Sequence, residues 1–407
     1  MSKTSFKLLG GVSGEIPELP AADTIRVPLK GHSTKTVKKK AVVSPGSLVA
    51  EHDLPGMGHA HSPITGSVAN VDDKYVELTS ALPKPKKDDE EPPKPPVVEK
   101  VELFGKKGEE LEKALNSLGV STLGMAKPIL VINGLNPEPG VTVHEHLLKE
   151  EASTIEKGLQ LIKDFVSPSE VYLVVPEGDE VQVSGAVSVP VKPVYPNSVD
   201  ALAVKAATGR ELPEDVGSIS VLELWQIGRV AETGMPVTET VCTVGGLDMK
   251  IKIGTPASYV LEKAGIEIDQ CDKIVMGGPM LGTAVDSLDE PVGKSTYGLF
   301  VISFRAFPAV TDQQCLNCGE CVLICPSRIR PNMIGRYAEF RMFEMCRQYD
   351  IEACIECGLC AYYCTARRPL LQLILLAKAE LGAGETEAVA CFITGAVQEE
   401  EKAEAEA

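Results

Sequence analysis

The sequence has few aromatic residues, an excess of acidic over basic residues, and no long apolar run. Aromatic side chains make up 5% of its 407 residues, with one tryptophan, which argues against a platform for stacking bases. Its 40 Lys and Arg stand against 57 Asp and Glu, giving a formal net charge of −17. We therefore expect no nucleic-acid partner, since a nucleic-acid surface neutralises phosphates. No stretch approaches 18 consecutive apolar residues, so we also expect no direct membrane span.

The N-terminus has no secretory signal that we can recognise, because the apolar part of residues 1–11 is too short. We therefore expect a cytosolic protein, and disulfides are rare in the cytosol. The chain nevertheless has 12 cysteines, and eight of them form two runs between Cys315 and Cys364. In a reducing compartment such clustering indicates metal binding.

The two cysteine runs share the spacing C-x2-C-x2-C-x3-C, which is typical of two-cluster ferredoxins. In that arrangement three thiolates on a tight loop clasp one cluster, and the fourth ligates the other cluster. We therefore assign one [4Fe-4S] cluster to Cys315, Cys318, Cys321 and Cys364. The second [4Fe-4S] cluster is assigned to Cys354, Cys357, Cys360 and Cys325. Structural zinc instead favours C-x2-C pairs.

Residues around these runs support the same interpretation. Gly319 and Gly358 follow the second cysteine of each run and permit tight wrapping. Pro326 follows the first run, whereas Thr365 follows the second, at a position that supplies no ligand. The other cysteines, Cys242, Cys271, Cys346 and Cys391, are isolated, and we expect Cys242 to be core packing.

Composition divides the rest of the chain into regions. Residues 1–82 contain short β-rich segments separated by turns, and residues 83–100 hold six prolines and ten charges, which is typical of a solvated linker. Three histidines in the first region, His52, His59 and His61, are interpreted as exposed loop rather than as a metal site. The last region, 382–407, is an acidic tail.

The middle of the chain alternates helical and strand patterns. Within 101–236 we expect helices at 109–118 and 142–166 and strands at 129–134 and 171–175. This alternation favours a parallel α/β sheet, whose ligands would lie beyond strand ends, at residues 133–140.

Two further regions follow the α/β region. The pattern in residues 237–304 predicts a small α+β unit. Residues 305–381 are predicted to form the cluster domain, which ends in a helix over 369–381. The glycine-rich turn at 276–282 is suited to cradling an anion or to close backbone approach. We favour the structural role, because no Lys-Ser/Thr follows it as a phosphate loop requires.

Several segments, in order along the chain, resemble the C subunit of the Rnf ion-translocating electron-transport complexes. They are residues 10–12, 25–32, 61–68, 206–211, 253–256 and 276–282, together with both cysteine runs. The resemblance implies a multidomain α/β and α+β protein. Its parts would be a lipoyl-like hybrid β-barrel (1–82), a Rossmann-like α/β domain (101–236), a β-grasp unit (237–304) and a two-[4Fe-4S] ferredoxin-like helical domain (305–381). No lipoyl-attachment signature is present, so no covalent lipoyl role is implied.

The flavin site of that family is altered in this sequence. Family members have a glycine-rich loop with Phe-Pro before the first α/β strand, and residues 118–126 lack the Phe-Pro and most of the glycines. The next flavin motif survives as Asn133, Glu138 and Gly140, without the acidic residues between them, and residues 195–198 lack the family's glycines. A glycine-poor loop brings fewer backbone N–H groups to a phosphate, so we expect a degenerate FMN and NADH site.

The expected function is therefore electron relay through two [4Fe-4S] clusters, without a self-contained active site. The resemblance implies a peripheral subunit on the cytoplasmic side of the inner membrane, bound to the other subunits of an ion-translocating redox complex. Its electron partner would be ferredoxin, NADH or a cytochrome-linked carrier; arginines make the cluster domain locally basic, which fits an acidic partner. The alternatives are a soluble NADH-dependent flavin/iron-sulfur reductase similar to cobalamin reductases, and a non-catalytic assembly scaffold.

Overall fold

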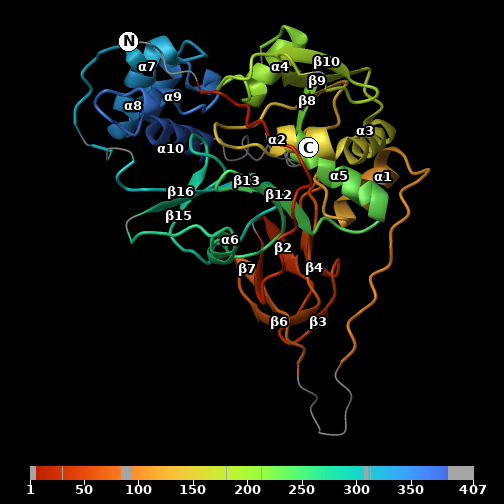
Figure 1. Cartoon of the computed structure of the whole chain (residues 1–407). Helices are drawn as coiled ribbons and strands as arrows, with labels where there is room; N and C mark the ends of the chain where they lie inside the picture. The colour runs from red at the N-terminus through yellow and green to blue at the C-terminus, as the bar shows by residue number, and fades with distance from the viewer. Residues whose placement is uncertain are drawn as a thin grey trace, which may run out of the picture. The chain divides into compact units, whose positions relative to one another are not determined.

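The protein divides into two compact units, Met1–Ile302 and Ser303–Ala407 (Figure 1). The computed structural model describes residues 6–383 except 30, 84–92, 180, 212, 271, 307–309 and 312. Most of the predicted linker, Cys271, Cys391 and the acidic tail beyond 383 lie outside these described residues.

The first unit begins with two small antiparallel sheets, drawn in red and orange in Figure 1. One sheet has the order β1-β7-β6-β3 and the other the order β2-β4-β5. The strands are β1 (Thr24–Pro28), β2 (His32–Lys35), β3 (Val42–Val43), β4 (Leu48–His52), β5 (Ala60–His61), β6 (Gly66–Val71) and β7 (Tyr75–Thr79). Alternate residues of paired strands, such as Ile25 and Val27 on β1 and Val76 and Leu78 on β7, are buried in a shared core. The prediction of short strands in this region is confirmed.

A four-stranded parallel sheet follows, in the order β10-β9-β8-β11. Its strands are β8 (Ile129–Asn133), β9 (Glu170–Pro176), β10 (Val187–Val191) and β11 (Val216–Ser220). Its helices are α1 (Gly108–Ser117), α2 (Val143–Glu150), α3 (Ala152–Val166), α4 (Asp200–Thr208) and α5 (Val221–Thr233). Leu130 and Ile132 join the core that contains α3 and α5, whereas Val131 packs with Ala203 of α4. The predicted parallel α/β sheet is confirmed. The single helix expected over 142–166 is wrong, because two helices, α2 and α3, meet at Glu151.

Helices α3 and α5 pack closely because each carries a glycine at the contact. A Cβ at Gly158 would overlap the Leu224 carbonyl, and one at Gly228 would overlap the Thr154 carbonyl. The start of α5 is fixed locally by Ser220, whose hydroxyl accepts the Glu223 N–H in a capping box. This helix pair supports one face of the parallel sheet.

The remaining sheet of the first unit is mixed, with the order β13-β12-β16-β14-β15. Its strands are β12 (Glu239–Val244), β13 (Leu247–Lys252), β14 (Lys273–Met276), β15 (Thr283–Val285) and β16 (Gly298–Ile302), and the helix is α6 (Ala257–Lys263). Cys242 is fully buried on β12 in the core of this sheet, as expected for a packing residue. The predicted α+β character of this region is confirmed.

The second unit is built from short helices around the cysteine runs. They are α7 (Glu320–Ile324), α8 (Pro331–Glu339), the 3₁₀ helices η1 (Phe343–Tyr349) and η2 (Ile351–Ala353), α9 (Leu359–Tyr362) and α10 (Leu370–Ala383). Helix α10, expected from the sequence, buries Leu370, Ile374, Ala377 and Leu381 at helical spacing against α8 and the cysteine helices.

The architecture is thus a mixed α/β protein with several sheets and a helical, cysteine-rich C-terminal part. None of the helices within the described residues has the length and apolarity to cross a membrane. The lipoyl-like, Rossmann-like, β-grasp and ferredoxin-like identities, with their boundaries, stay predictions.

Candidate metal centre

The two cysteine runs adopt the same local structure. In each run the residue before the second cysteine and the residue after it have positive φ: Asn317 (52°) and Gly319 (81°), then Glu356 (59°) and Gly358 (75°). This path turns the chain sharply and delivers the third cysteine to the first turn of a short helix, α7 or α9. The loop is therefore shaped to bring three sulfurs of one run to one side.

The fold then brings the fourth cysteine of each run to the other run. One small cavity is lined by Cys315, Cys318, Cys321 and Cys364. Another is lined by Cys325, Cys354, Cys357 and Cys360. The structure thus places together the same two sets of four that the spacing predicts. Whether each set holds a [4Fe-4S] cluster stays a prediction.

Two backbone N–H groups donate to sulfurs of the first set, and a hydroxyl lies within hydrogen-bond distance of a third. The N–H groups of Asn317 and Arg368 lie 3.4 Å from Cys315 Sγ and Cys364 Sγ. The Thr365 hydroxyl lies 3.3 Å from Cys318 Sγ and, with a backbone N–H, lowers the pKa of this exposed thiol. Such hydrogen bonds stabilise thiolates, the form that binds metal.

The second set is more enclosed. Cys357 and Cys360 are each 8% exposed, and burial raises the pKa of both thiols, that of Cys357 to about 11. Backbone N–H groups act in the opposite direction on Cys354 and Cys357. A buried thiol with a raised pKa becomes a thiolate when a cation is bound to it.

The donor sets fit two four-iron clusters. Each cavity is lined by four thiols and has donors directed at the sulfurs, as thiolate-ligated clusters require. In the described part of the chain, no three His, Cys, Asp or Glu side chains are grouped to hold a single metal ion. Cys346 belongs to neither set: it is fully buried and its Sγ lies 3.6 Å from the Ile334 carbonyl.

The loop that corresponds to the family's flavin loop has most of its backbone N–H groups already bonded within the protein. Those of Gly119 and Val120 donate to helix α1, and those of Thr122 and Leu123 both donate to the Gly56 carbonyl. A phosphate cradle needs N–H groups that point at the ligand. Residues 118–126 therefore leave few N–H groups for the phosphate of FMN.

The other residues of the altered flavin motif also contact the protein itself. Asn133, at the carboxyl end of β8, donates through Nδ2 to the Ser198 carbonyl at 2.8 Å and to Asp200 Oδ1 at 2.7 Å. Its Oδ1 is buried without a partner among the described residues. Gly140 closes the loop with a positive φ of 83°.

Glu138 enters the glycine-rich turn at 276–282. Its carboxylate is fully buried and accepts the N–H groups of Met280 at 2.5 Å and Leu281 at 3.0 Å and the Tyr297 hydroxyl at 2.7 Å. A Cβ at Gly278 would overlap this carboxylate. The turn thus cradles an anion, and that anion is a side chain of the same protein.

The interpretation of the three histidines as exposed loop is wrong for two of them. His52 and His61 are buried at strand ends, and His59 is half-buried. The His59 Nδ1 accepts the His52 backbone N–H at 3.1 Å, so these histidines are tied into the fold. The turn-rich segment carries no local signal of this burial, because it depends on packing against distant segments.

Comparison with known proteins adds an independent observation. No protein-family model matches the chain. It is 27% identical over 280 residues to the C subunit of the Na⁺-translocating ferredoxin:NAD⁺ oxidoreductase complex of Acetobacterium woodii, an alignment covering 62% of each chain. It is 25% identical over 384 residues to the C subunit of the ion-translocating oxidoreductase complex of Rhodobacter capsulatus, covering 80% of this chain and 74% of that one. Identity to the C subunit of the proton-translocating ferredoxin:NAD⁺ oxidoreductase complex of Clostridium ljungdahlii is 26% over 419 residues, 90% of both chains.

The chain is similar to these C subunits over most of its length. The predicted resemblance to the Rnf C subunit is thereby confirmed. Among solved structures, a chain of an air-oxidized NAD⁺-reducing [NiFe]-hydrogenase is 12% identical with a TM-score of 0.39, covering 63% of this chain and 55% of that chain.

Sequence reasoning missed two contacts at the candidate sites. Thr365 was assigned no ligand role, yet its hydroxyl contacts Cys318, 47 residues away. Glu138 was treated as a remnant of a flavin motif, although its partners lie in a turn 142 residues away. The sequence around Thr365 and Glu138 gives no local signal of contacts with such distant segments.

Proposed function

We propose that the chain is the electron-transferring C subunit of an Rnf-type, membrane-bound, ion-translocating oxidoreductase complex. The observation that carries this proposal is the pairing of Cys325 and Cys364 with the opposite cysteine runs, so that two separate sets of four thiols form. The similarity to the C subunits over most of the chain supports it. When bound, two [4Fe-4S] clusters would supply reversible one-electron carriers.

The chain's own residues would hold and tune these carriers. Four thiolates bind each cluster, while the Thr365 hydroxyl and the N–H groups of Asn317 and Arg368 donate to the sulfurs of the first set. The helical core around Cys346 fixes both loops. On this proposal the subunit has no catalytic residue of its own and lies on the cytoplasmic side of the inner membrane, held by integral partner subunits.

We further propose that this subunit does not use FMN or NADH. The support is the loop at 118–126, most of whose N–H groups are bonded within the protein, and the burial of Glu138 in the glycine-rich turn. The electron partner would then be a ferredoxin or a cytochrome-linked carrier. The arginines of the second unit that make no ion pair among the described residues, such as Arg328 and Arg341, favour an acidic protein.

Cofactor analysis of anaerobically purified protein tests this function. We expect about eight iron and about eight acid-labile sulfide per chain and no flavin, since each cubane has four of each. Stoichiometric FMN that survives desalting would instead support the soluble flavin reductase alternative. Zinc in place of iron and sulfide would contradict the relay altogether.

Membrane association is tested separately. An affinity-tagged chain, isolated from gently solubilised membranes, should co-purify with integral membrane subunits. Recovery of all of the chain in the soluble fraction, without such partners, would contradict the complex. Clusters that no ferredoxin or cytochrome-linked carrier can reduce or oxidise would favour the assembly-scaffold alternative.

A further inference from the structure

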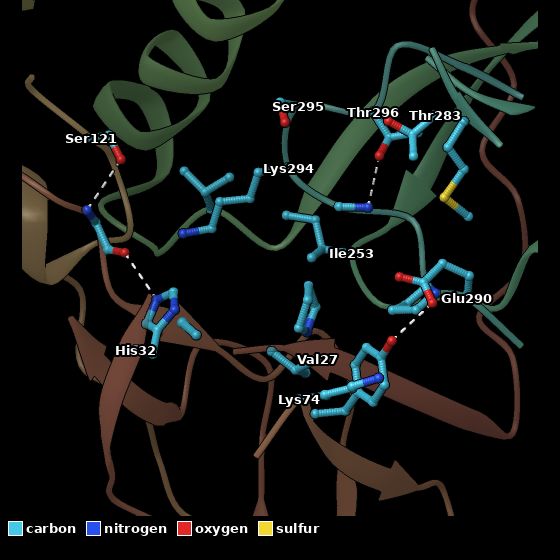
Figure 2. Close-up of a pocket in the computed structure, with 18 of the residues that line it drawn as sticks. Val27, His32, Lys74, Ser121, Ile253, Thr283, Glu290, Lys294, Ser295 and Thr296 are labelled. Atoms are coloured by element: carbon cyan, nitrogen blue, oxygen red, sulfur yellow. Dashed lines mark hydrogen bonds between the residues drawn. The ribbon is translucent and has the colours of Figure 1, made fainter. Parts of the chain in front are cut away.

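The first unit contains a cavity of about 900 Å³ that the relay function does not use. Figure 2 shows side chains converging on it from the N-terminal strands below and from the segment 290–297 above. Its walls combine apolar residues, such as Val27 and Ile253, with polar ones, such as Ser121 and Thr283. This size and mixture are typical of small-molecule sites.

Lys294 gives this cavity a positive charge. Its Nζ donates to the His59 carbonyl at 2.7 Å and to the Gly119 carbonyl at 2.9 Å, which uses two of the three ammonium donors. The residue is half-buried, and desolvation lowers its pKa to about 8. No acidic side chain within the described residues acts on that pKa or forms an ion pair with Lys294.

Desolvating a cation that has no ion pair is costly. His61, 5% exposed, also lines the cavity, and its Nδ1 has no hydrogen-bond partner among the described residues. Burial first, and then the Lys294 charge, lower the pKa of His61 to about 3, so this imidazole stays neutral. Burial lowers the pKa of His52 and His59 as well; the Asp53 and Glu51 carboxylates act in the opposite direction on His52 and His59, and Lys294 adds a smaller lowering. Neither of these carboxylates acts on the pKa of Lys294, so this cation lacks the paired negative charge that desolvated cations usually have.

The opposite side of the cavity has a different character. Figure 2 shows Glu290 across the cavity from Lys294, with one carboxylate oxygen accepting the Tyr75 hydroxyl at 2.8 Å. Apolar side chains, including Met57 and Leu281, form part of the wall. A ligand that matches these features has an anionic group at one end and an apolar body.

We propose that this cavity binds a small organic anion, with its carboxylate or phosphate group paired to Lys294 and its apolar body against Val27 and Ile253. The order Gly293-Lys294-Ser295 is that of the end of a phosphate loop, but the strand β16 follows it instead of a helix. Recognition therefore rests on the Lys294 charge and the cavity walls. This proposal is independent of the iron-sulfur function.

Equilibrium dialysis of the full chain tests the site with three probes that share one ring system: 1-naphthyl phosphate, 1-naphthoate and 1-naphthylmethylamine. The two anions distinguish a phosphate ligand from a carboxylate ligand, and the amine has the same apolar body with opposite charge. We expect at least one anion to bind and the amine not to bind. Lys294→Met should weaken anion binding about tenfold or more, the effect of losing one charged hydrogen-bonding partner.

Two further variants keep the result interpretable. Ser295→Trp fills the cavity from an exposed wall position and leaves the Lys294 contacts in place. It should also abolish binding. This variant tests the proposal even if Lys294→Met fails to fold. Lys39→Met removes an exposed charge elsewhere and should leave binding unchanged. Three results would each overturn the proposal. They are binding of the amine as tight as that of the anions, anion binding by Ser295→Trp as tight as by the unchanged chain, and no anion binding at millimolar concentration.

Discussion

The two sets of cysteines are built from the same spacing but lie in different surroundings. The first set contains the buried Cys321 but also Cys318, which is exposed and contacts the Thr365 hydroxyl. The second includes Cys357 and Cys360, which are buried in the helical core. The spacing of the cysteines thus determines which thiols come together, while the packing around them determines their access to solvent. Solvent access is one of the factors that set the reduction potential of a cluster. We infer that electrons exchange with a docking partner at the first set.

The strongest test of the comparison asks whether the two sets are separate. Cys315→Ser/Cys364→Ser removes two thiols from one set, so about four of about eight irons should remain. Cys315→Ser/Cys325→Ser removes one thiol from each set and should leave almost none. Iron and acid-labile sulfide determinations on anaerobically purified variants measure both. If each run instead bound its own cluster, Cys315→Ser/Cys364→Ser would lose almost all of its iron. Cys315→Ser/Cys325→Ser would then keep about four irons.

Chelator access would sharpen the difference in exposure. With a strong Fe²⁺ chelator, we expect iron loss in two phases of similar size, with the first about tenfold faster, because an exposed site needs less local opening. Absorbance of the iron-chelator complex follows both phases. Cys315→Ser/Cys364→Ser should retain only the slow phase. If that variant retained the fast phase, the assignment of exposure would be wrong.

Acid should destabilise the first unit more than the second, because all six histidines lie in the first unit. Burial lowers the pKa of His61 to about 3 and of His144 to about 4, from 6.5. Between those values and 6.5 the unfolded chain binds more protons, so the free energy of unfolding falls as pH decreases, by up to about 1.4 kcal/mol per pH unit for each histidine. Urea unfolding followed by fluorescence of the buried Trp225 measures this slope.

The control for this pH effect is His61→Gln, which has no titrating ring. In this variant the free energy of unfolding should depend less steeply on pH between pH 4.5 and 6, by up to about 1.4 kcal/mol per pH unit, which corresponds to one proton. Above pH 7.5 the slope should be unchanged. Identical slopes in the two proteins over the acidic range would contradict the burial of a neutral imidazole.

The smallest expected effect concerns Thr365. Thr365→Val removes the hydroxyl beside Cys318 at similar volume, so the cluster of the first set should become harder to reduce, on the order of tens of millivolts. A redox titration monitored by electron paramagnetic resonance measures both midpoints. Pro326→Ala changes the equivalent position after the other run and should leave the first midpoint unshifted. An unchanged midpoint in Thr365→Val would contradict the contact.

Local patterns predicted much of this molecule, and long-range contacts explain what they missed. Strand β8 and helix α10 follow from apolar runs and helical spacing that lie within one segment. The break at Glu151 was missed because apolar spacing continues through it. The burial of His61 and the role of Lys294 could not be predicted, because their environments come from segments up to 235 residues apart.

For the candidate metal centre, the sequence specified the grouping of the cysteines but not their environment. Cysteine type and spacing restrict the loop to few geometries, since the positive-φ turn at Gly319 or Gly358 follows from the residue order. Solvent exposure and the Thr365 contact depend on how the two runs face each other. That arrangement is a property of the packed helices α8 and α10.

The carboxylate of Glu138 has a consequence for the glycine-rich turn that holds it. Because the side chain is covalently part of the same fold, it competes with any external anion as a tethered ligand, at an effective concentration on the order of millimolar or higher. It also satisfies the N–H groups of Met280 and Leu281. The turn therefore needs no external phosphate compound to satisfy these two groups, and any such compound would have to displace the carboxylate.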